Sequence, residues 1–402
     1  MDISFADVDA ARAALIGVTH KTPLDFSNTL SKLTGASVSL KLENLQRTGS
    51  FKVRGAYWKM KNLDKSQTKR VIAASAGNHA QGTAFAASRL GIPCTIVMPE
   101  NASTAKVAAT SSYGASIVLA GTNFEESLDE ANRLAERTSA TMIHPFNDPL
   151  IIAGQGTVAL EVLEEMNDIE AIVVPVGGGG LISGMAVALK EHHPEVKIVG
   201  VQSSLMDSMV RSKRANKVVE IPSQRTIADG IAVKSPGELT FKIVNKYVDY
   251  LVTVTDDEIA EAIFLLLERS RVVVEPAGAA APAALLSGKI DLQGKKVVAV
   301  VSGGNVDMPL MNQLVTRGLI TAGRIVRLIF ELRDRPGALK EILEAIASRN
   351  VNVLDVQQDR LNKRIGLGPV NVLISMETKG REQTEELLKT LRERAFIYRF
   401  FE

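Results

Sequence analysis

Lys52 has the setting in this chain that best suits covalent chemistry. It follows Phe51 in the run Gly49-Ser-Phe-Lys52, where small residues let the backbone come close to a bound group and the phenyl ring offers a flat apolar face. A lysine amine attacks carbonyl groups when burial or a nearby cation lowers its pKa. A lysine with such neighbours can equally be a solvated surface group, so other residues must support this hypothesis.

Three loops rich in small residues each follow a predicted strand and could surround a cofactor. The first loop opens a helix, and the free backbone N–H groups at a helix start favour an anion such as a carboxylate. The second is a run of four glycines, whose ordering cost makes sense if the backbone wraps a phosphate. The third ends a strand with a serine and two glycines. The loops contain, in chain order, Ser75, Gly77, Asn78 and His79; Gly177, Gly178, Gly179, Gly180 and Leu181; and Ser302.

None of these loops is specific alone, because tight turns and helix caps use the same residues. The four-glycine loop matches neither of two nucleotide-binding motifs. A Rossmann fingerprint needs an acidic residue at the end of the next strand, where this chain has Gln202, and no Gly-Lys-Ser/Thr follows as a P-loop requires. Together with Lys52, the three loops indicate a flat, phosphorylated cofactor that bears a carbonyl group.

Composition excludes several classes of partner. The 402 residues carry a formal net charge of +2 and 4% aromatic residues, which predicts no nucleic-acid partner. No apolar run approaches the ~18 residues of a membrane span, and the N-terminus lacks the pattern of a signal peptide. The single cysteine, Cys94, cannot form an intramolecular disulfide. We therefore expect a soluble, cytoplasmic protein without a membrane partner.

The elements that must position these residues alternate between strands and helices, which predicts an α/β fold with parallel-rich sheets covered by helices. Two groups of units indicate two lobes, with a site in the cleft at the carboxyl ends of the strands. Helices are expected at 78–90, 104–113, 124–138, 156–167, 181–192 and 256–270. Strands are expected at 36–42, 70–74, 94–99, 116–120, 141–144, 171–176, 197–202, 250–254 and 295–301.

The last part of the chain has a different pattern and is predicted to be a separate domain. An alternating strand at 325–333 precedes a helix at 338–348, and two strands at 351–357 and 370–377 flank a hairpin loop at 361–368. A charged helix at 379–394 and a strand at 395–401 follow. This βαββαβ order is the ferredoxin-like pattern.

With these motifs in place, the chain resembles the threonine dehydratases (threonine ammonia-lyases) among the fold type II, tryptophan synthase beta-like, pyridoxal-phosphate enzymes. The C-terminal part resembles an ACT regulatory domain. The resemblance implies a catalytic domain over 1–323, with a smaller lobe at about 54–149, and an ACT domain over 325–402. The matching stretches are Ser50-Phe-Lys-Val-Arg-Gly-Ala56, Ser75-Ala-Gly-Asn-His-Ala-Gln81, Gly177-Gly-Gly-Gly-Leu181, Ala228-Asp-Gly230, Glu275-Pro-Ala-Gly278, Ser302-Gly-Gly-Asn305 and, in the ACT part, Asp334-Arg-Pro-Gly-Ala-Leu339.

The resemblance also implies a role for each matched position. Lys52 would hold pyridoxal 5'-phosphate as a Schiff base and act as the catalytic base at the substrate Cα. The remaining cofactor contacts would be Phe51 beside the ring, Asn78 at the ring hydroxyl, Gly177, Gly178, Gly179, Gly180 and Leu181 around the phosphate, and Ser302 at the pyridine nitrogen. The substrate carboxylate would meet Ser75, Gly77, Asn78 and His79. An amino-acid effector would meet Asp334, Gly337, Ala338 and Leu339.

The function that this resemblance implies is deamination of L-threonine to 2-oxobutanoate and ammonia by β-elimination, and of L-serine to pyruvate. The ACT domain implies allosteric control by isoleucine or valine in a homo-oligomer, a dimer or tetramer, at the first step of isoleucine biosynthesis. An L-serine dehydratase, a serine racemase-like enzyme and a non-catalytic amino-acid sensor are the alternatives.

We predict that the protein requires no divalent metal. Relatives that include serine racemase bind a divalent cation through an acidic pair, and the corresponding positions in this chain are Gln202 and Ser208. Two neutral side chains make a poor Mg²⁺ or Ca²⁺ site. His144, His192 and His193 have no zinc-site spacing and are predicted to be surface residues.

Overall fold

The computed structural model describes residues 3–64, 66–359 and 369–401. Contacts within the chain divide it into two units, Met1–Asp307 and Met308–Glu402. The first unit holds two sheets, which confirms the prediction of a two-lobed α/β fold. Across the described residues, no helix is both long enough and apolar enough to cross a membrane.

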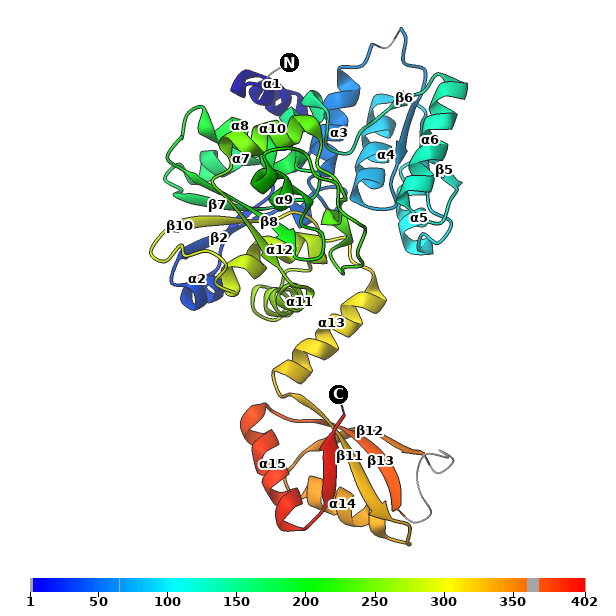
Figure 1. The fold of residues 1–402 in the computed structure, drawn as a ribbon, viewed down its shortest axis with the longest axis vertical. Helices are drawn as coiled ribbons and strands as arrows, with labels where there is room; N and C mark the ends of the chain where they lie inside the picture. Colours follow the sequence, from blue (N-terminus) through cyan, green and yellow to red (C-terminus); the bar gives the residue numbers. More distant parts are fainter. Residues whose placement is uncertain (1–2, 65, 360–368, 402) are drawn as a thin grey trace. The chain divides into compact units, whose positions relative to one another are not determined.

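The larger sheet of the first unit has six strands in the order β1-β2-β10-β7-β8-β9, and all but β1 run parallel. Its central strands are rich in valine and buried, as expected for a parallel sheet covered on both faces. Figure 1 shows α7, α8 and α10 on one side of this sheet and α2, α11 and α12 on the other. Its strands are β1 (Leu24–Phe26), β2 (Ser37–Leu42), β7 (Ala171–Pro175), β8 (Lys197–Ser203), β9 (Tyr250–Val254) and β10 (Lys296–Val301).

The smaller sheet is parallel, in the order β5-β4-β3-β6. One apolar cluster includes residues of α3 and α4, and another joins the sheet to α6. Its strands are β3 (Val71–Ala74), β4 (Cys94–Met98), β5 (Ser116–Leu119) and β6 (Thr141–Met142).

The α-helices of this unit follow most of the predicted ranges, and several had not been predicted. They are α1 (Phe5–Leu15), α2 (Asn28–Thr34), α3 (Lys52–Lys61), α4 (Asn78–Leu90), α5 (Thr104–Ser111), α6 (Phe124–Thr138), α7 (Pro149–Glu165), α8 (Gly180–Lys190), α9 (Ser208–Ala215), α10 (Glu238–Tyr247), α11 (Asp256–Leu265) and α12 (Pro276–Leu286). Helix α11 continues as a π-helical turn at Leu266–Ser270.

The start of α7 corrects the predicted helix at 156–167. Asp148 caps this helix by accepting the N–H groups of Leu150 and Ile151, and Pro149 occupies its first turn. Gly154 and Gly156 lie inside the helix because neighbouring backbones pass too close for a side chain. A Cβ at Gly154 would lie 2.6 Å from Gly55 Cα, and one at Gly156 would lie 2.6 Å from the Gly184 carbonyl oxygen.

The second unit confirms the ferredoxin-like order predicted for the C-terminal part. After helix α13 (Met308–Thr321), it contains β11 (Ile325–Arg333), α14 (Ala338–Ala347), β12 (Asn352–Asp359), β13 (Pro369–Glu377), α15 (Arg381–Glu393) and β14 (Ile397–Phe400). The four strands form an antiparallel sheet in the order β12-β13-β11-β14, and their alternate apolar residues pack on α14 and α15. The predicted hairpin loop at 361–368 lies outside the described residues.

Candidate active site

Lys52 is the first residue of α3, and its side chain is partly buried. Its Nζ atom donates a hydrogen bond of 3.1 Å to the carbonyl of Pro145 and lies 5.2 Å from the centre of the Phe51 ring. Burial lowers the pKa of this amine to about 8. A substantial neutral fraction at physiological pH makes Lys52 a competent nucleophile and base.

The Ser302 loop lies beside the lysine segment. Ser302 is buried where β10 ends, and its carbonyl accepts the backbone N–H of Phe51 at 3.3 Å. Ser50 forms an antiparallel bridge with Gly303. The structure therefore brings together two segments that lie about 250 positions apart in the sequence.

The glycine loop connects β7 to α8 and packs closely against neighbouring side chains. A Cβ added at Gly178 would lie 2.4 Å from the ring carbons of Phe146, and Gly179 has a φ of +95°, which favours glycine. Leu181 is buried in the first turn of α8. The unpaired N–H groups of this helix start suit a phosphate. Phe146 follows Pro145, so one segment borders both this loop and the Lys52 amine.

The Ser75 loop leads into α4, which begins at Asn78. Ser75 Oγ accepts the N–H of Gly77 at 3.1 Å, and a Cβ at Gly77 would meet no atom within 4 Å, so the backbone here faces open space. The imidazole of His79 instead points into the core, where its Nε2–H donates to the Ile143 carbonyl at 2.8 Å and burial lowers its pKa to about 3. What His79 can offer to a carboxylate is its backbone N–H.

Two residues at this site were missed by the sequence analysis. His144, predicted to be a surface residue, is partly buried, and its Nδ1 accepts the N–H groups of Phe146 and Asn147. Burial, with the nearby charge of Lys52, lowers its pKa to about 4. Glu275 had been noted only as part of a matching motif, yet its buried side chain lies within hydrogen-bonding distance of Asn78.

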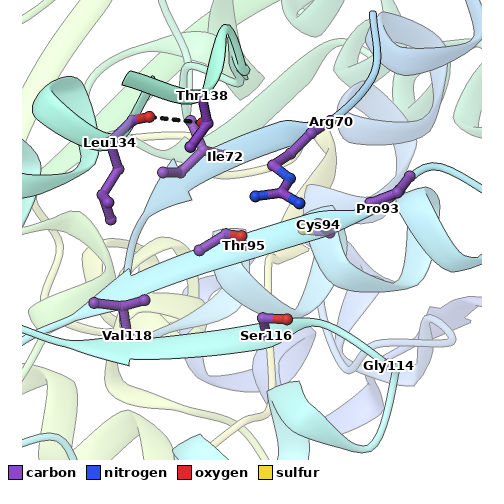
Figure 2. Close-up of a pocket in the computed structure, with 10 residues that line it drawn as sticks. All are labelled: Arg70, Ile72, Pro93, Cys94, Thr95, Gly114, Ser116, Val118, Leu134 and Thr138. Carbon is purple, nitrogen blue, oxygen red and sulfur yellow. Dashed lines mark hydrogen bonds between the residues drawn. The ribbon is translucent and has the colours of Figure 1, made fainter. Parts of the chain in front are cut away.

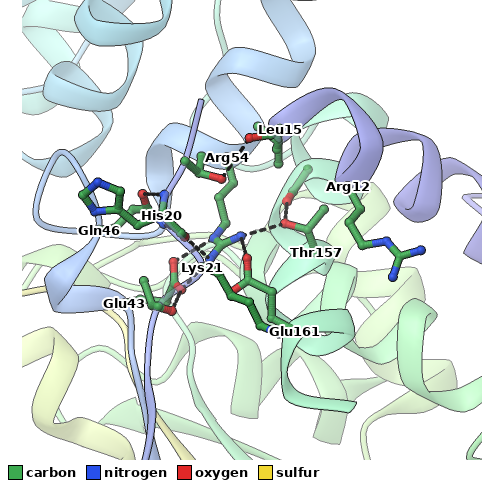
Figure 3. A network of polar contacts seen from close by, with 12 residues as sticks. Arg12, Leu15, His20, Lys21, Glu43, Gln46, Arg54, Thr157 and Glu161 are labelled. Carbon is green, nitrogen blue, oxygen red and sulfur yellow. Dashed lines mark hydrogen bonds and ion pairs between the residues drawn. The ribbon is translucent and has the colours of Figure 1, made fainter. Parts of the chain in front are cut away.

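A buried ionic network anchors the helix that carries Lys52 (Figure 3). Arg54 is fully enclosed and pairs with Glu43 at 2.7 Å and with Glu161 at 2.6 Å, and Lys41 contacts Glu161 at 2.7 Å. These carboxylates raise the pKa of Arg54, which in turn lowers that of Glu43. Two cations and two carboxylates balance one another, so removing one would leave a buried charge without compensation.

Two pockets in the first unit are lined by few of the candidate active-site residues. One of them, drawn in Figure 2, is lined by Arg70, by two loop residues and by residues of β3, β4, β5 and α6 that include Thr95 and Thr138. Its volume is about 330 Å³. It contains none of the predicted site residues. A second, of about 270 Å³, is lined by residues that include Gly49, Arg271 and Asn305. Neither is lined by Lys52.

The residues present fit pyridoxal phosphate. A partly buried lysine amine with a lowered pKa suits its aldehyde, the glycine backbone at the start of α8 suits its phosphate, and the strand-end hydroxyl of Ser302 is a neutral partner for a ring nitrogen. Lys52 and these loops thus define the class of the protein as a pyridoxal-phosphate enzyme of fold type II. A sequence model of the family "Pyridoxal-phosphate dependent enzyme" matches residues 17–303, and the chain belongs to this family.

The C-terminal part of the chain matches a second family, and the chain as a whole is similar to several known proteins. An ACT domain model matches residues 326–395. The chain is 48% identical over 390 residues to an L-threonine ammonia-lyase of Thermotoga maritima, and the match covers 97% of each chain. Among solved structures, a maize serine racemase matches with a TM-score of 0.75 and 37% identity, covering 80% of this chain and 99% of that one. A threonine deaminase of Solanum lycopersicum matches with a TM-score of 0.74 and 36% identity, covering 78% and 92%.

The two positions considered for a divalent cation, Gln202 and Ser208, form hydrogen bonds within the protein. Gln202 Oε1 accepts the backbone N–H of Val210 at 3.0 Å, and Ser208 Oγ donates to the Val233 carbonyl at 2.7 Å. Within the part of the chain that the structure describes, no three or more histidine, cysteine or acidic side chains gather as a metal site. Independence from divalent metal stays a prediction.

The predicted effector residues lie together in the loop after β11 and in the first turn of α14. Asp334 and Gly337 are exposed, and Gly337 caps α14 with a φ of +88°. Ala338 is buried, and Leu339 packs on the apolar core of the ACT domain. Effector binding at this loop stays a prediction.

Proposed function

We propose that the protein is an L-threonine ammonia-lyase that converts L-threonine to 2-oxobutanoate and ammonia. The observation that carries this proposal is the 48% identity to the Thermotoga maritima L-threonine ammonia-lyase across 97% of both chains, which spans the catalytic and the ACT domain. L-Serine, which lacks only the methyl group of threonine, would give pyruvate, because one methyl group is worth only about 1–3 kcal/mol of discrimination.

In this proposal the residues divide the work between binding and proton transfer. When bound, pyridoxal phosphate supplies an electron-withdrawing system that acidifies the substrate Cα–H. The neutral amine of Lys52 removes that proton, since its pKa of about 8 leaves it partly unprotonated at neutral pH. The α4 helix start, with Ser75, orients the carboxylate. The β-hydroxyl group takes up a proton and leaves as water, which completes the elimination. The released enamine tautomerises to an imine, and a second water molecule hydrolyses this imine to 2-oxobutanoate and ammonia.

The direct test supplies the holoenzyme with L-threonine, L-serine and D-serine and traps 2-oxo acids with a hydrazine. We expect 2-oxobutanoate from L-threonine at the highest kcat/KM and pyruvate from L-serine at a lower value. A Lys52→Ala variant is the matched control and should form neither product. An absence of 2-oxobutanoate from L-threonine would overturn the proposal.

A serine-directed enzyme is the second candidate, because the maize serine racemase covers 80% of this chain at 37% identity. Pyruvate from L-serine without 2-oxobutanoate from L-threonine would favour an L-serine dehydratase. Formation of D-serine from L-serine would favour a racemase. A non-catalytic amino-acid sensor predicts no product from any of the three substrates.

The ACT domain extends the proposal to regulation. Isoleucine or valine would bind near Asp334, Gly337, Ala338 and Leu339 and shift turnover in a homo-oligomer, a dimer or tetramer, that feeds isoleucine biosynthesis in the cytoplasm. Allosteric coupling of about 1–3 kcal/mol is typical. If neither amino acid changes threonine turnover or its cooperativity, this regulatory role is wrong.

A further inference from the structure

A chain of hydrogen bonds assigns the orientation of the Asn78 amide. Asn305 Nδ2 donates to the carbonyl of Thr48 at 2.8 Å, and a carbonyl can only accept. The same nitrogen donates to Asn78 Oδ1 at 2.7 Å, and Asn78 Nδ2 therefore faces Glu275 Oε1, to which it donates at 2.6 Å. Each bond in this series fixes the next, so the Thr48 carbonyl determines which end of the Asn78 amide carries hydrogen.

Two glycines leave the space that the side chains in this series of contacts occupy. A Cβ at Gly303 would lie 2.2 Å from Glu275 Oε1, and a Cβ at Gly49 would lie 2.3 Å from Asn305 Oδ1. Glu275 is buried, and burial together with the charge of Asp229 raises its pKa to about 8. A largely neutral carboxyl group at neutral pH still accepts the Asn78 amide without placing a full negative charge at the site.

From this geometry we infer that Asn305 and Glu275 are positioning residues that hold Asn78 with its NH₂ group toward the cofactor side of the site. Of the two hydrogens on Asn78 Nδ2, one is used by Glu275, and the other is the donor for the ring oxygen of pyridoxal phosphate. A flipped amide would present an acceptor to that oxygen instead. The hydrogen bond from Asn78 to the cofactor thus depends on four segments of the chain, which contribute Thr48, Asn78, Glu275 and Asn305.

The inference rests on the proposed contact between Asn78 and the ring oxygen. The experiment below distinguishes a failure of that contact from a failure of the positioning role. The experiment measures the Kd of pyridoxal phosphate and the visible absorption band of the bound cofactor, neither of which needs a substrate. We expect Asn78→Ala and Asn305→Ala each to weaken binding about tenfold, the size of one hydrogen bond, and to shift the band in the same direction. Glu275→Leu should do the same, whereas Glu275→Gln keeps an acceptor and should restore most of the affinity.

The decisive comparison is a double-mutant cycle. If Asn305 acts through Asn78, then Asn305→Ala should change neither the Kd nor the band in an Asn78→Ala background. A full tenfold loss in that background would overturn the positioning role. If Asn78→Ala itself has no effect, the contact with the ring oxygen is wrong. Should Asn305→Ala fail to fold, the isosteric Asn305→Asp, which cannot donate to Thr48 or Asn78, carries the same cycle.

Discussion

From the lowered pKa of Lys52 we predict that capture of the cofactor by the apoprotein depends strongly on pH. Only the neutral amine attacks an aldehyde. Burial lowers the pKa from 10.5 to about 8, so the neutral fraction at pH 7 rises from about 0.03% to about 9%, a gain of roughly 300-fold. The rate of capture should therefore rise with pH, level off above a midpoint near pH 8 and change little beyond pH 9.

The assay is stopped-flow absorbance after pyridoxal phosphate is mixed with apoprotein between pH 6.5 and 10.5. A free lysine derivative, treated in the same way, corrects for the titration of the cofactor itself. The stability of the apoprotein gives an independent readout. Between pH 8 and 10.5 the unfolded chain binds more protons than the folded one, so the free energy of unfolding should rise by roughly 3 kcal/mol, and Lys52→Met should abolish that rise. A capture midpoint at pH 10 or above would refute the argument, because it would describe an ordinary solvated lysine.

Three further predictions test the elements around the lysine. Arg54→Gln should lower the free energy of unfolding in urea by about 3–5 kcal/mol, because it leaves Glu43 buried without its partner; a loss below 1 kcal/mol would contradict a balanced buried network. Gly178→Ala should weaken pyridoxal phosphate binding about ten- to hundredfold, because the new Cβ meets the Phe146 ring at 2.4 Å, and should affect binding of pyridoxal, which lacks the phosphate, far less; equal losses would mean that the loop does not bind the phosphate. Chelation with EDTA should leave threonine turnover unchanged because Gln202 is neutral, and activity that is lost and then restored by Mg²⁺ would show that a divalent cation is required.

Much of the fold was predictable because its signals are local. Parallel strands buried on both faces appear as runs of valine and isoleucine, and the alternating pattern at 325–333 matched β11 (Ile325–Arg333) at both ends. The start of α7 was less predictable because Gly154 and Gly156 resemble helix breakers. Their role depends on Gly55 and Gly184, which the fold brings against them from other helices.

Some residues of the candidate site could likewise be predicted from the local sequence, whereas others depend on contacts between distant segments. The glycine loop and Lys52 were found because each lies in an unusual local sequence. His144 was assigned to the surface, since nothing in its neighbourhood indicates that its ring accepts two N–H groups beside Lys52. Glu275 and Asn305 meet Asn78 only in the folded chain, about 200 positions away from it. Residues that act through such contacts leave no local pattern.

The covalent attachment of the cofactor tests the central claim most directly. Borohydride reduction of the holoenzyme fixes the bond between the amine and the aldehyde carbon, and mass spectrometry of the digested protein then identifies the modified residue. The structure predicts one phosphopyridoxyl group, on Lys52, and a colourless, inactive Lys52→Ala protein. A phosphopyridoxyl group on another lysine with Lys52 unmodified, or a Lys52→Ala protein that remains yellow and active, would contradict the account.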